Sequence, residues 1–479
     1  MRRFELIKYV TTLLLLGLLS ACTVGPNYLR PKVETPVSYK EVEGWKQAEP
    51  KDHIPRGAWW TIFNDDQLNG LEKQVNISNQ NLKAAEAQYR EAVALVKAAQ
   101  AAYFPTVTGG PSVSRERPSG NAPGSRGATL APGVSFTSSD YILSGQLTWE
   151  IDLWGKIRRQ VESAKASAQA SFADIEGVRL SAQAQLAQDY FQLRALDSQK
   201  QILETTVANY QKFLDLTRNR YATGVAAQSD IQTAQVQLDT AQAQLVGLGV
   251  QRAQFEHAIA ILMGRAPSDF TIPVTPLDGP PPETPSGIPS ELLERRPDIA
   301  AAERQAASAN AQIGVAIAAY YPALTLNASG GFEASTLSKW FTWPSRFWTL
   351  GPASLQQIIF NGGLTQAQVE QARATYDANV ATYRQTVLTG FQQVEDNLAA
   401  LRILEQQARA QDIAVTSSKK NVEITVNQYK VGTASALDVI TTEAIALNNE
   451  LSAAIILGNR MTSAVLLVQA LGGGWQVCE

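Results

Sequence analysis

The chain has 479 residues, of which 45% are hydrophobic, 8% aromatic and 18% charged, with a formal net charge of -3 at pH 7. This length allows two or three ordinary domains, and the slight excess of acidic residues argues against a nucleic-acid-binding surface, which is basic. The chain contains only two histidines and two cysteines, His53, His257, Cys22 and Cys478. We therefore expect neither an enzyme nor a protein with a metal site.

The N-terminus carries the pattern of an export signal. Arg2, Arg3 and Lys8 precede a short apolar run at 13–19, and the tetrad Leu19-Ser20-Ala21-Cys22 follows. The run is shorter than the roughly 20 residues of a permanent transmembrane helix, so we interpret residues 1–21 as a removed signal peptide.

The Leu-Ser-Ala-Cys tetrad resembles the lipobox of bacterial lipoproteins. The resemblance implies that Cys22 becomes the first mature residue and is acylated, and Thr23, in place of aspartate, implies sorting to the outer membrane. The alternative is an ordinary thiol behind a simple secretory signal. With Cys22 acylated, Cys478 has no intramolecular partner for a disulfide. Apart from this covalent lipid, we expect no cofactor.

The mature chain contains two similar halves. Ala-Ala-Tyr-Phe-Pro at 101–105 recurs as Ala-Ala-Tyr-Tyr-Pro at 318–322, and Tyr-Ala-Thr-Gly at 221–224 returns as Tyr-Lys-Val-Gly at 429–432. This duplication predicts one supersecondary unit present twice. The expected divisions are a lipidated extended segment at 22–67, a first structural repeat at 68–266, a proline-rich connector at 267–296, a second repeat at 297–475 and a tail at 476–479.

The spacing of hydrophobic residues changes along each half, from alternation typical of strands to a pattern typical of helices. Residues 141–153 and 324–332 alternate apolar and small side chains with polar ones, which predicts strands. The partner segment at 105–117 is less regular, and we expect Pro111, Pro118, Pro123 and Pro132 to place much of this loop outside any sheet ladder.

Residues 155–221 and 363–429 contain no proline and are rich in Ala, Gln, Leu and Glu. They predict helices of about 65 residues, or about 100 Å. Shorter helices are expected at 68–103, 229–263, 297–320 and 437–471. Helices this long need neighbours at their sides, either in a ring or in a plain coiled-coil stalk.

The strands of an outer-membrane lipoprotein indicate a transmembrane β-barrel, because only a closed barrel pairs every strand in lipid. Four strands in one chain cannot close a barrel, so further copies must supply the rest. Aromatic side chains gather near one hairpin end and suit the headgroup region; they are Trp340, Phe341, Trp343, Phe347 and Trp348. The alternative is a lid over a soluble core.

Two further motifs are Tyr-x-x-Gly-x-x-x-x-x-Asp at both helical turns and Leu471-Gly472-Gly473-Gly474-Trp475 near the end of the chain. Together with the lipobox and the duplication, they resemble the outer-membrane efflux protein family of the TolC and OprM type, and especially its NodT-like lipoprotein branch. The resemblance implies an α+β membrane protein, a homotrimer whose 12-stranded β-barrel continues into a 12-helix periplasmic α-barrel. It also implies a periplasmic adaptor (a membrane fusion protein) and an inner-membrane transporter of the RND type as partners.

The resemblance places both helical turns at the periplasmic tip. The residues that would meet the adaptor are Thr223, Gly224, Val225, Val431, Gly432 and Thr433. Each glycine also serves as a helix stop.

The family pattern assigns a periplasmic gate to Asp230, Tyr429 and Asp438. Asp230 would bond to Tyr429, and Asp438 would face the pore and favour cations. Ala434 and Thr441 replace an arginine and a second pore aspartate of TolC, which weakens both expectations. The alternative for Asp230 and Asp438 is an ordinary carboxylate at a helix N-terminus.

We therefore expect an outer-membrane, lipid-anchored protein that extends into the periplasm and passively conducts small toxic compounds outward. One alternative is the exit duct of a type I-like polypeptide secretion system. Another is a periplasmic structural stalk without a pore.

Overall fold

The computed structural model describes residues 23–33, 57–117, 137–282 and 296–473. The expectations for the signal peptide, Cys22, Pro118, Pro123, Pro132, Cys478 and the tail at 476–479 therefore lie outside the described residues. The chain divides into two compact units. The sheet unit comprises Met1–Pro31, Arg90–Gln169 and Arg304–Ala381, and the helical unit comprises Lys32–Tyr89, Ala170–Glu303 and Thr382–Glu479.

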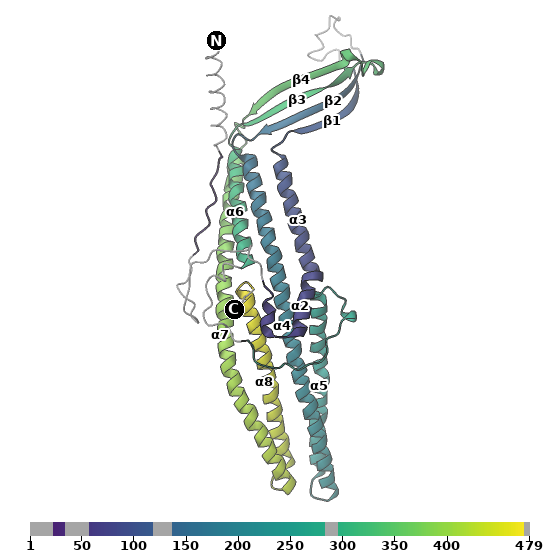
Figure 1. Ribbon diagram of the computed structural model, residues 1–479, viewed down its shortest axis with the longest axis vertical. Helices are drawn as coiled ribbons and strands as arrows, with labels where there is room; N and C mark the ends of the chain where they lie inside the picture. The colour runs from purple at the N-terminus through teal and green to yellow at the C-terminus, as the bar shows by residue number, and fades with distance from the viewer. Residues whose placement is uncertain (1–22, 34–56, 118–136, 283–295, 474–479) are drawn as a thin grey trace. The chain divides into compact units, whose positions relative to one another are not determined.

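The sheet unit is built on four antiparallel strands in the order β1-β2-β3-β4 (Figure 1). Their bounds are β1 Thr106–Glu116, β2 Ser138–Ile151, β3 Ala323–Ala334 and β4 Arg346–Gln356. The central β2–β3 pair joins the two halves of the chain. Within the described residues β1 and β4 each pair on one side only, so both outer edges of the sheet keep unpaired backbone groups.

The duplication extends to the pairing register at the start of each hairpin, up to a register shift between Leu326 and Ala328 in the second. Thr106 pairs with Thr148 in the first hairpin, and their repeats Ala323 and Gln356 pair in the second. The expectation for Pro111 was wrong, because it lies inside β1 opposite Leu143. Proline is compatible with this position because β1 is an edge strand, where the missing N–H need not face a neighbour.

The connection between β3 and β4, together with the start of β4, carries the aromatic side chains noted in the sequence. It contains two short 3-10 turns, Leu337–Lys339 and Trp343–Ser345. Phe341, Trp343 and Trp348 are exposed there. The hairpin end is therefore aromatic as expected, and its contact with lipid headgroups stays a prediction.

A docked N-terminal segment also belongs to the sheet unit. Val24 N donates to the Trp154 carbonyl at 3.0 Å, and the buried Arg159 donates to the carbonyls of Val24 and Gly25, both at 3.2 Å. Gly25 has φ +90°, and a Cβ there would lie 2.5 Å from the Cα of Gly314. The segment thus lies directly against α6 (Pro297–Ala318) and the start of α4 (Lys156–Ala222).

The two very long helices are confirmed. The helix α4 has 67 residues and α7 (Leu364–Val431) has 68. Each continues from the sheet unit into the helical unit and is followed by a helix of 35 residues, α5 (Gln228–Leu262) and α8 (Ala436–Ala470). By length and composition α8 could also cross a membrane, but half of its most apolar window is buried inside the structure, as in a core helix.

The single helix expected at 68–103 is two helices, α2 (Asp66–Ser78) and α3 (Gln80–Ala101). Asn79 separates them. Its Nδ2 donates to the Leu262 carbonyl at 2.7 Å, and its Oδ1 accepts from Leu82 N at 3.0 Å. One amide side chain therefore caps α3 and fixes the break against the end of α5, which apolar periodicity does not reveal.

The core of the helical unit lies where α2, α4, α5 and α8 pack around Trp59, Leu186, Tyr190 and Ile259. A charged network lies beside it. The fully buried Asp197 pairs with Arg194 at 3.1 Å and Arg252 at 2.8 Å, and accepts from Thr275 N at 3.0 Å. This network attaches the first part of the connector to α4 and α5.

Candidate gate at the helical turns

The turns that follow α4 and α7 have the same backbone geometry. Gly224 and Gly432 adopt φ +77° and +84°, the left-handed conformation that glycine takes without a Cβ penalty. Val225 N donates to the Arg220 carbonyl at 2.9 Å, and Thr433 N donates to the Gln428 carbonyl at 2.9 Å. Both glycines are therefore helix stops, as expected.

The residues expected to meet an adaptor all lie at these turns. Thr223, Gly224, Val225, Val431, Gly432 and Thr433 are exposed in the single chain. Val225 and Val431 are 64% and 76% exposed, which is unusual for valine and leaves an apolar surface at each turn. Their contact with an adaptor stays a prediction.

Asp438 begins α8 as part of a capping box. Its Oδ2 accepts from Ser435 N at 2.8 Å, and Asp438 N donates back to Ser435 Oγ at 3.2 Å. The hydrogen bonds from the Ser435 side chain and backbone lower the pKa of the Asp438 carboxyl. Asp438 is thus an exposed, ionised cap, and its position on a pore stays a prediction.

Asp230 begins α5 with half of the same arrangement. Its Oδ2 accepts from Ala227 N at 3.1 Å, and Ala227 has no hydroxyl with which to return a bond. The expected bond between Asp230 and Tyr429 is absent from the described residues. The Tyr429 hydroxyl lies 3.3 Å from Thr217 Oγ1 instead. Within the single chain each group thus has another partner, and the bond between Asp230 and Tyr429 stays a prediction.

Sequence reasoning did not single out Arg220, which contacts the end of α7. Its guanidinium carbon lies 4.5 Å from the centroid of the Tyr429 ring, and its Nη1 donates to the Tyr429 carbonyl. The available signal was a difference between the copies, since Arg220 precedes Tyr221 whereas Gln428 precedes Tyr429.

Two titratable groups lie farther along the same helices. Burial raises the pKa of the Glu443 carboxyl to about 7, and its Oε2 has no hydrogen-bond partner among the described residues. On α4, burial and then the charge of Glu443 raise the pKa of Tyr210 to about 12. Glu443 therefore changes charge near neutral pH beside the packed ends of α4 and α8.

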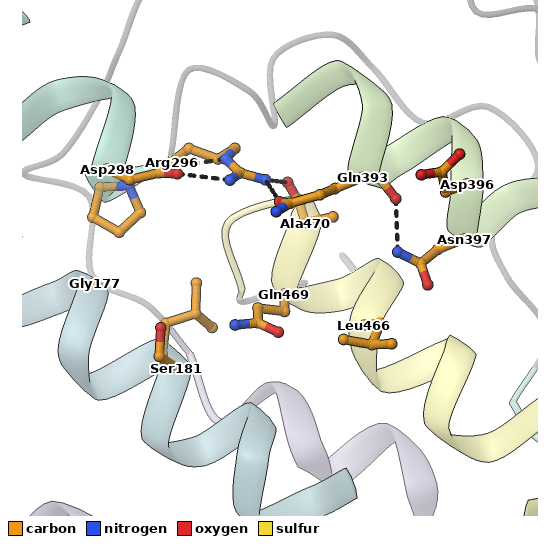
Figure 2. A pocket seen from close by; sticks show the side chains of 12 residues that line it. Gly177, Ser181, Arg296, Asp298, Gln393, Asp396, Asn397, Leu466, Gln469 and Ala470 are labelled. Atoms are coloured by element: carbon orange, nitrogen blue, oxygen red, sulfur yellow. Dashed lines mark hydrogen bonds and ion pairs between the residues drawn. The ribbon is translucent and has the colours of Figure 1, made fainter. Parts of the chain in front are cut away.

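A second polar site, far from the turns, joins the end of the connector to α7 and α8. A pocket of about 410 Å³ lies there. Figure 2 shows side chains that line it, among them Ser181, Asp298, Gln393 and Gln469. Arg296 bonds to Asp298 at 2.7 Å, to Gln393 Oε1 at 2.8 Å and to the Ala470 carbonyl at 2.9 Å. Because these internal contacts occupy the guanidinium, Arg296 has a structural role.

The sequence profile of the outer membrane efflux protein family matches residues 71–265 and 288–473. The chain belongs to this family. The two matched stretches contain both turns and both long helices, so the resemblance seen in the motifs is confirmed along most of the mature chain.

Individual relatives agree with this assignment. The chain is 28% identical over 473 residues to the probable efflux pump outer membrane protein TtgC of Pseudomonas putida, covering 98% of this chain and 96% of the relative. It is 32% identical over 436 residues to the pyoverdine export outer membrane protein OpmQ of Pseudomonas putida, covering 90% and 92%.

The solved structure of the outer-membrane channel OprN superposes with a TM-score of 0.84 at 30% identity, covering 95% of this chain and all of that chain. The open MtrE channel of Neisseria gonorrhoeae superposes with a TM-score of 0.77 at 26% identity, covering 95% and 98%. The chain therefore has the α+β fold of these outer-membrane channels. It is an outer-membrane channel component of an efflux system, as the sequence predicted.

Proposed function

We propose that the chain works as a homotrimer whose three sheets close a 12-stranded barrel and whose helices continue it as a periplasmic conduit. The single observation that carries this proposal is the four-stranded sheet with two unpaired edges, β1 and β4. Unpaired backbone groups are too costly in lipid to remain open, and further copies of the same chain supply matching edges. Transport through such a conduit is passive and needs no enzymatic step in this chain.

Acylation of Cys22 anchors the mature chain in this proposal. The support is the position of Thr23, the residue after Cys22. Thr23 packs closely against Gly155, because a Cβ on Gly155 would lie 2.7 Å from Thr23 Cγ2. Gly155 lies between the end of β2 and the start of α4. The docked segment thus holds the residue after Cys22 at one end of the sheet, where a lipid anchor joins a membrane-embedded barrel.

The exposed turns contact a periplasmic adaptor, and an inner-membrane transporter, of the RND type, supplies the energy. Small toxic compounds are the cargo we favour over polypeptides. The support is that the relatives' names describe export of toluene, pyoverdine and cations, all of them small. Because these substrates differ so much, the transporter rather than the channel selects among them.

Complementation of a strain that lacks its own efflux channel tests this function. The full-length chain, with its adaptor and transporter, should restore resistance to several small toxic compounds. Cys22→Ser is a matched variant that keeps the fold but removes the lipid, and it should reduce the amount of channel in the outer membrane. Restored secretion of a polypeptide without restored resistance would favour the secretion duct. Folded protein without bilayer conductance would favour the stalk.

A further inference from the structure

Glu72 on α2 is a carboxyl group enclosed in the core of the helical unit. Its exposed fraction is 0%, and neither Oε1 nor Oε2 has a hydrogen-bond partner in the part of the chain that the structure describes. Leu68, Leu71 and Val75 accompany it on the buried face of α2 and belong to the main apolar cluster. Because Glu72 is enclosed within one chain, association with further copies leaves it buried.

The nearest polar atom along α2 does not satisfy an ionised Glu72. Asn69 Oδ1, three residues earlier, is also a buried acceptor without a partner among the described residues. Residues three apart are neighbours on a helix, so an ionised Glu72 would place three acceptor oxygens close together without a donor. A proton on Glu72 supplies that donor, because the acid O–H can donate to Asn69 Oδ1. The side-chain chemistry of α2 therefore favours the neutral acid.

No positive charge compensates an ionised Glu72. The titratable and charged groups on the surrounding elements are Asp65 before α2 and Lys73 on it, Asp189, Tyr190 and Arg194 on α4, Arg252 and Glu256 on α5, and Arg460 on α8. None of them forms an ion pair or hydrogen bond with Glu72 within the described ranges. Burial accordingly raises the pKa of the Glu72 carboxyl well above 4.5. An ionised Glu72 would be an uncompensated buried charge, which strongly destabilises the packing around it.

The helix α2 is attached to its neighbours by hydrogen bonds at both ends. At its start, the Tyr190 hydroxyl donates to Asp65 Oδ2 at 2.5 Å, and at its end Ser78 Oγ donates to the Met263 carbonyl at 2.5 Å. Between these points its buried residues are apolar except for Glu72. A helix of 13 residues depends on such packing for its stability. The docking of α2 therefore depends on the charge of the side chain at the centre of its buried face.

We propose that Glu72 is a pH-sensitive switch in the helical unit: as the neutral acid it lets α2 pack in the core, and loss of its proton to water releases α2. The direction follows from proton linkage. Below pH 4.5 the carboxyl is protonated whether α2 is docked or released, so release does not depend on pH. Above pH 4.5 the released form gives up a proton that the docked form keeps, and release becomes easier by up to about tenfold per pH unit.

Thiol labelling of Val75→Cys measures the release of α2, because Val75 is fully buried one turn after Glu72. The purified full-length channel is labelled with a maleimide, and the α2 peptide is quantified by mass spectrometry relative to the denatured chain at the same pH. This ratio should rise by about tenfold or more between pH 5 and pH 7. Adding Glu72→Gln should make the ratio independent of pH, because the amide cannot ionise and still donates to Asn69. A ratio that does not change with pH in the chain with Glu72, or an equal rise with Glu72→Gln, would overturn the proposal.

Val465→Cys is the matched control for general loosening of the core. Val465 lies on α8 in the same apolar cluster and is also fully buried. Its labelling ratio should not follow the pH dependence seen at residue 75, and an equal rise at both positions would overturn a switch confined to α2. Hydrogen exchange of the α2 peptide in the chain without added cysteines, corrected for the intrinsic exchange rate, should show the same pH dependence as the thiol at residue 75. Exchange that does not change with pH would likewise contradict the switch.

Discussion

At the residue scale, the carboxyl groups near the turns differ in their surroundings and therefore in what they can do. Asp438 is exposed and kept ionised by hydrogen bonds from Ser435, whereas Glu443 is shielded and one of its oxygens has no hydrogen-bond partner in the part of the chain that the structure describes. The first can act on ions at neutral pH. The second responds to pH, because burial penalises its charged form.

Asp438→Ala should lower cation selectivity, measured as the reversal potential in a salt gradient across a bilayer. Asp438→Asn is the matched control for capping, because its side-chain oxygen still accepts from Ser435 N while the charge is lost. Both variants should shift the reversal potential toward zero, and only the alanine variant should also lower the thermal stability. Unchanged reversal potentials in both would remove Asp438 from the pore.

Glu443→Gln should abolish part of the pH dependence of stability. The pKa of Glu443 is raised from 4.5 to about 7 in the folded chain. Below pH 4.5 both states are protonated, and as the pH rises to about 7 the unfolded state releases a proton that the folded state retains. The native chain therefore loses stability over that window, by about 1 to 3 kcal/mol, and the variant does not.

Thermal unfolding at pH 5 and pH 7.5 measures this difference. Relative to the native chain, the variant should be more stable to heat at pH 7.5 than at pH 5. An equal difference between the two proteins at both pH values would show that Glu443 does not titrate in this window.

The glycines and acids at the turns could be predicted from sequence because local chemistry fixes them. A glycine in the left-handed conformation ends a helix, and an acid at its third position accepts a hydrogen bond from a backbone N–H three residues earlier. Both effects involve only residues that are close in the sequence. Arg220 could not be predicted in the same way, since its partner lies 209 residues away and only the folded chain brings them together. The contact of the Tyr429 hydroxyl with Thr217 on α4 was missed for the same reason.

At the element scale, the docked segment after Cys22 depends on one buried arginine. Arg159→Ala removes the donors to Val24 and Gly25 and to Asn27 Oδ1, which lies at 2.8 Å. We expect residues 23–27 to become accessible to protease while the sheet stays folded. Arg158→Ala, one position away on the same helix, is the control and should leave the segment protected. Protection retained in Arg159→Ala would contradict the assigned role.

The long helices and the strands were predictable, because hydrophobic period and proline content act over many residues. The division at Asn79 was not, since its cause is a single amide that bonds to Leu262 on another helix. Pro111 was misassigned because the edge position of β1, which permits a proline, follows only from the strand order.

At the scale of the whole molecule, the repeat predicts how two copies meet. Gly145 pairs with Gly330 where the halves join inside the chain. At offsets of 208 for β2 to β4 and 217 for β1 to β3, the repeats of these residues are Ala353 and Val113. These offsets relate the two hairpin registers up to the shift between Leu326 and Ala328, and we expect β4 of one copy to meet β1 of the next with Ala353 opposite Val113.

Disulfide trapping of this pair tests most directly whether identical chains close the channel. In outer membranes, Val113→Cys with Ala353→Cys should give cross-linked trimers under oxidising conditions, because directly opposite strand residues are close enough for a disulfide. Val113→Cys with Trp348→Cys, which is out of register, should not. Cross-links absent from the first pair, or equally abundant in both, would contradict closure by three copies in this register.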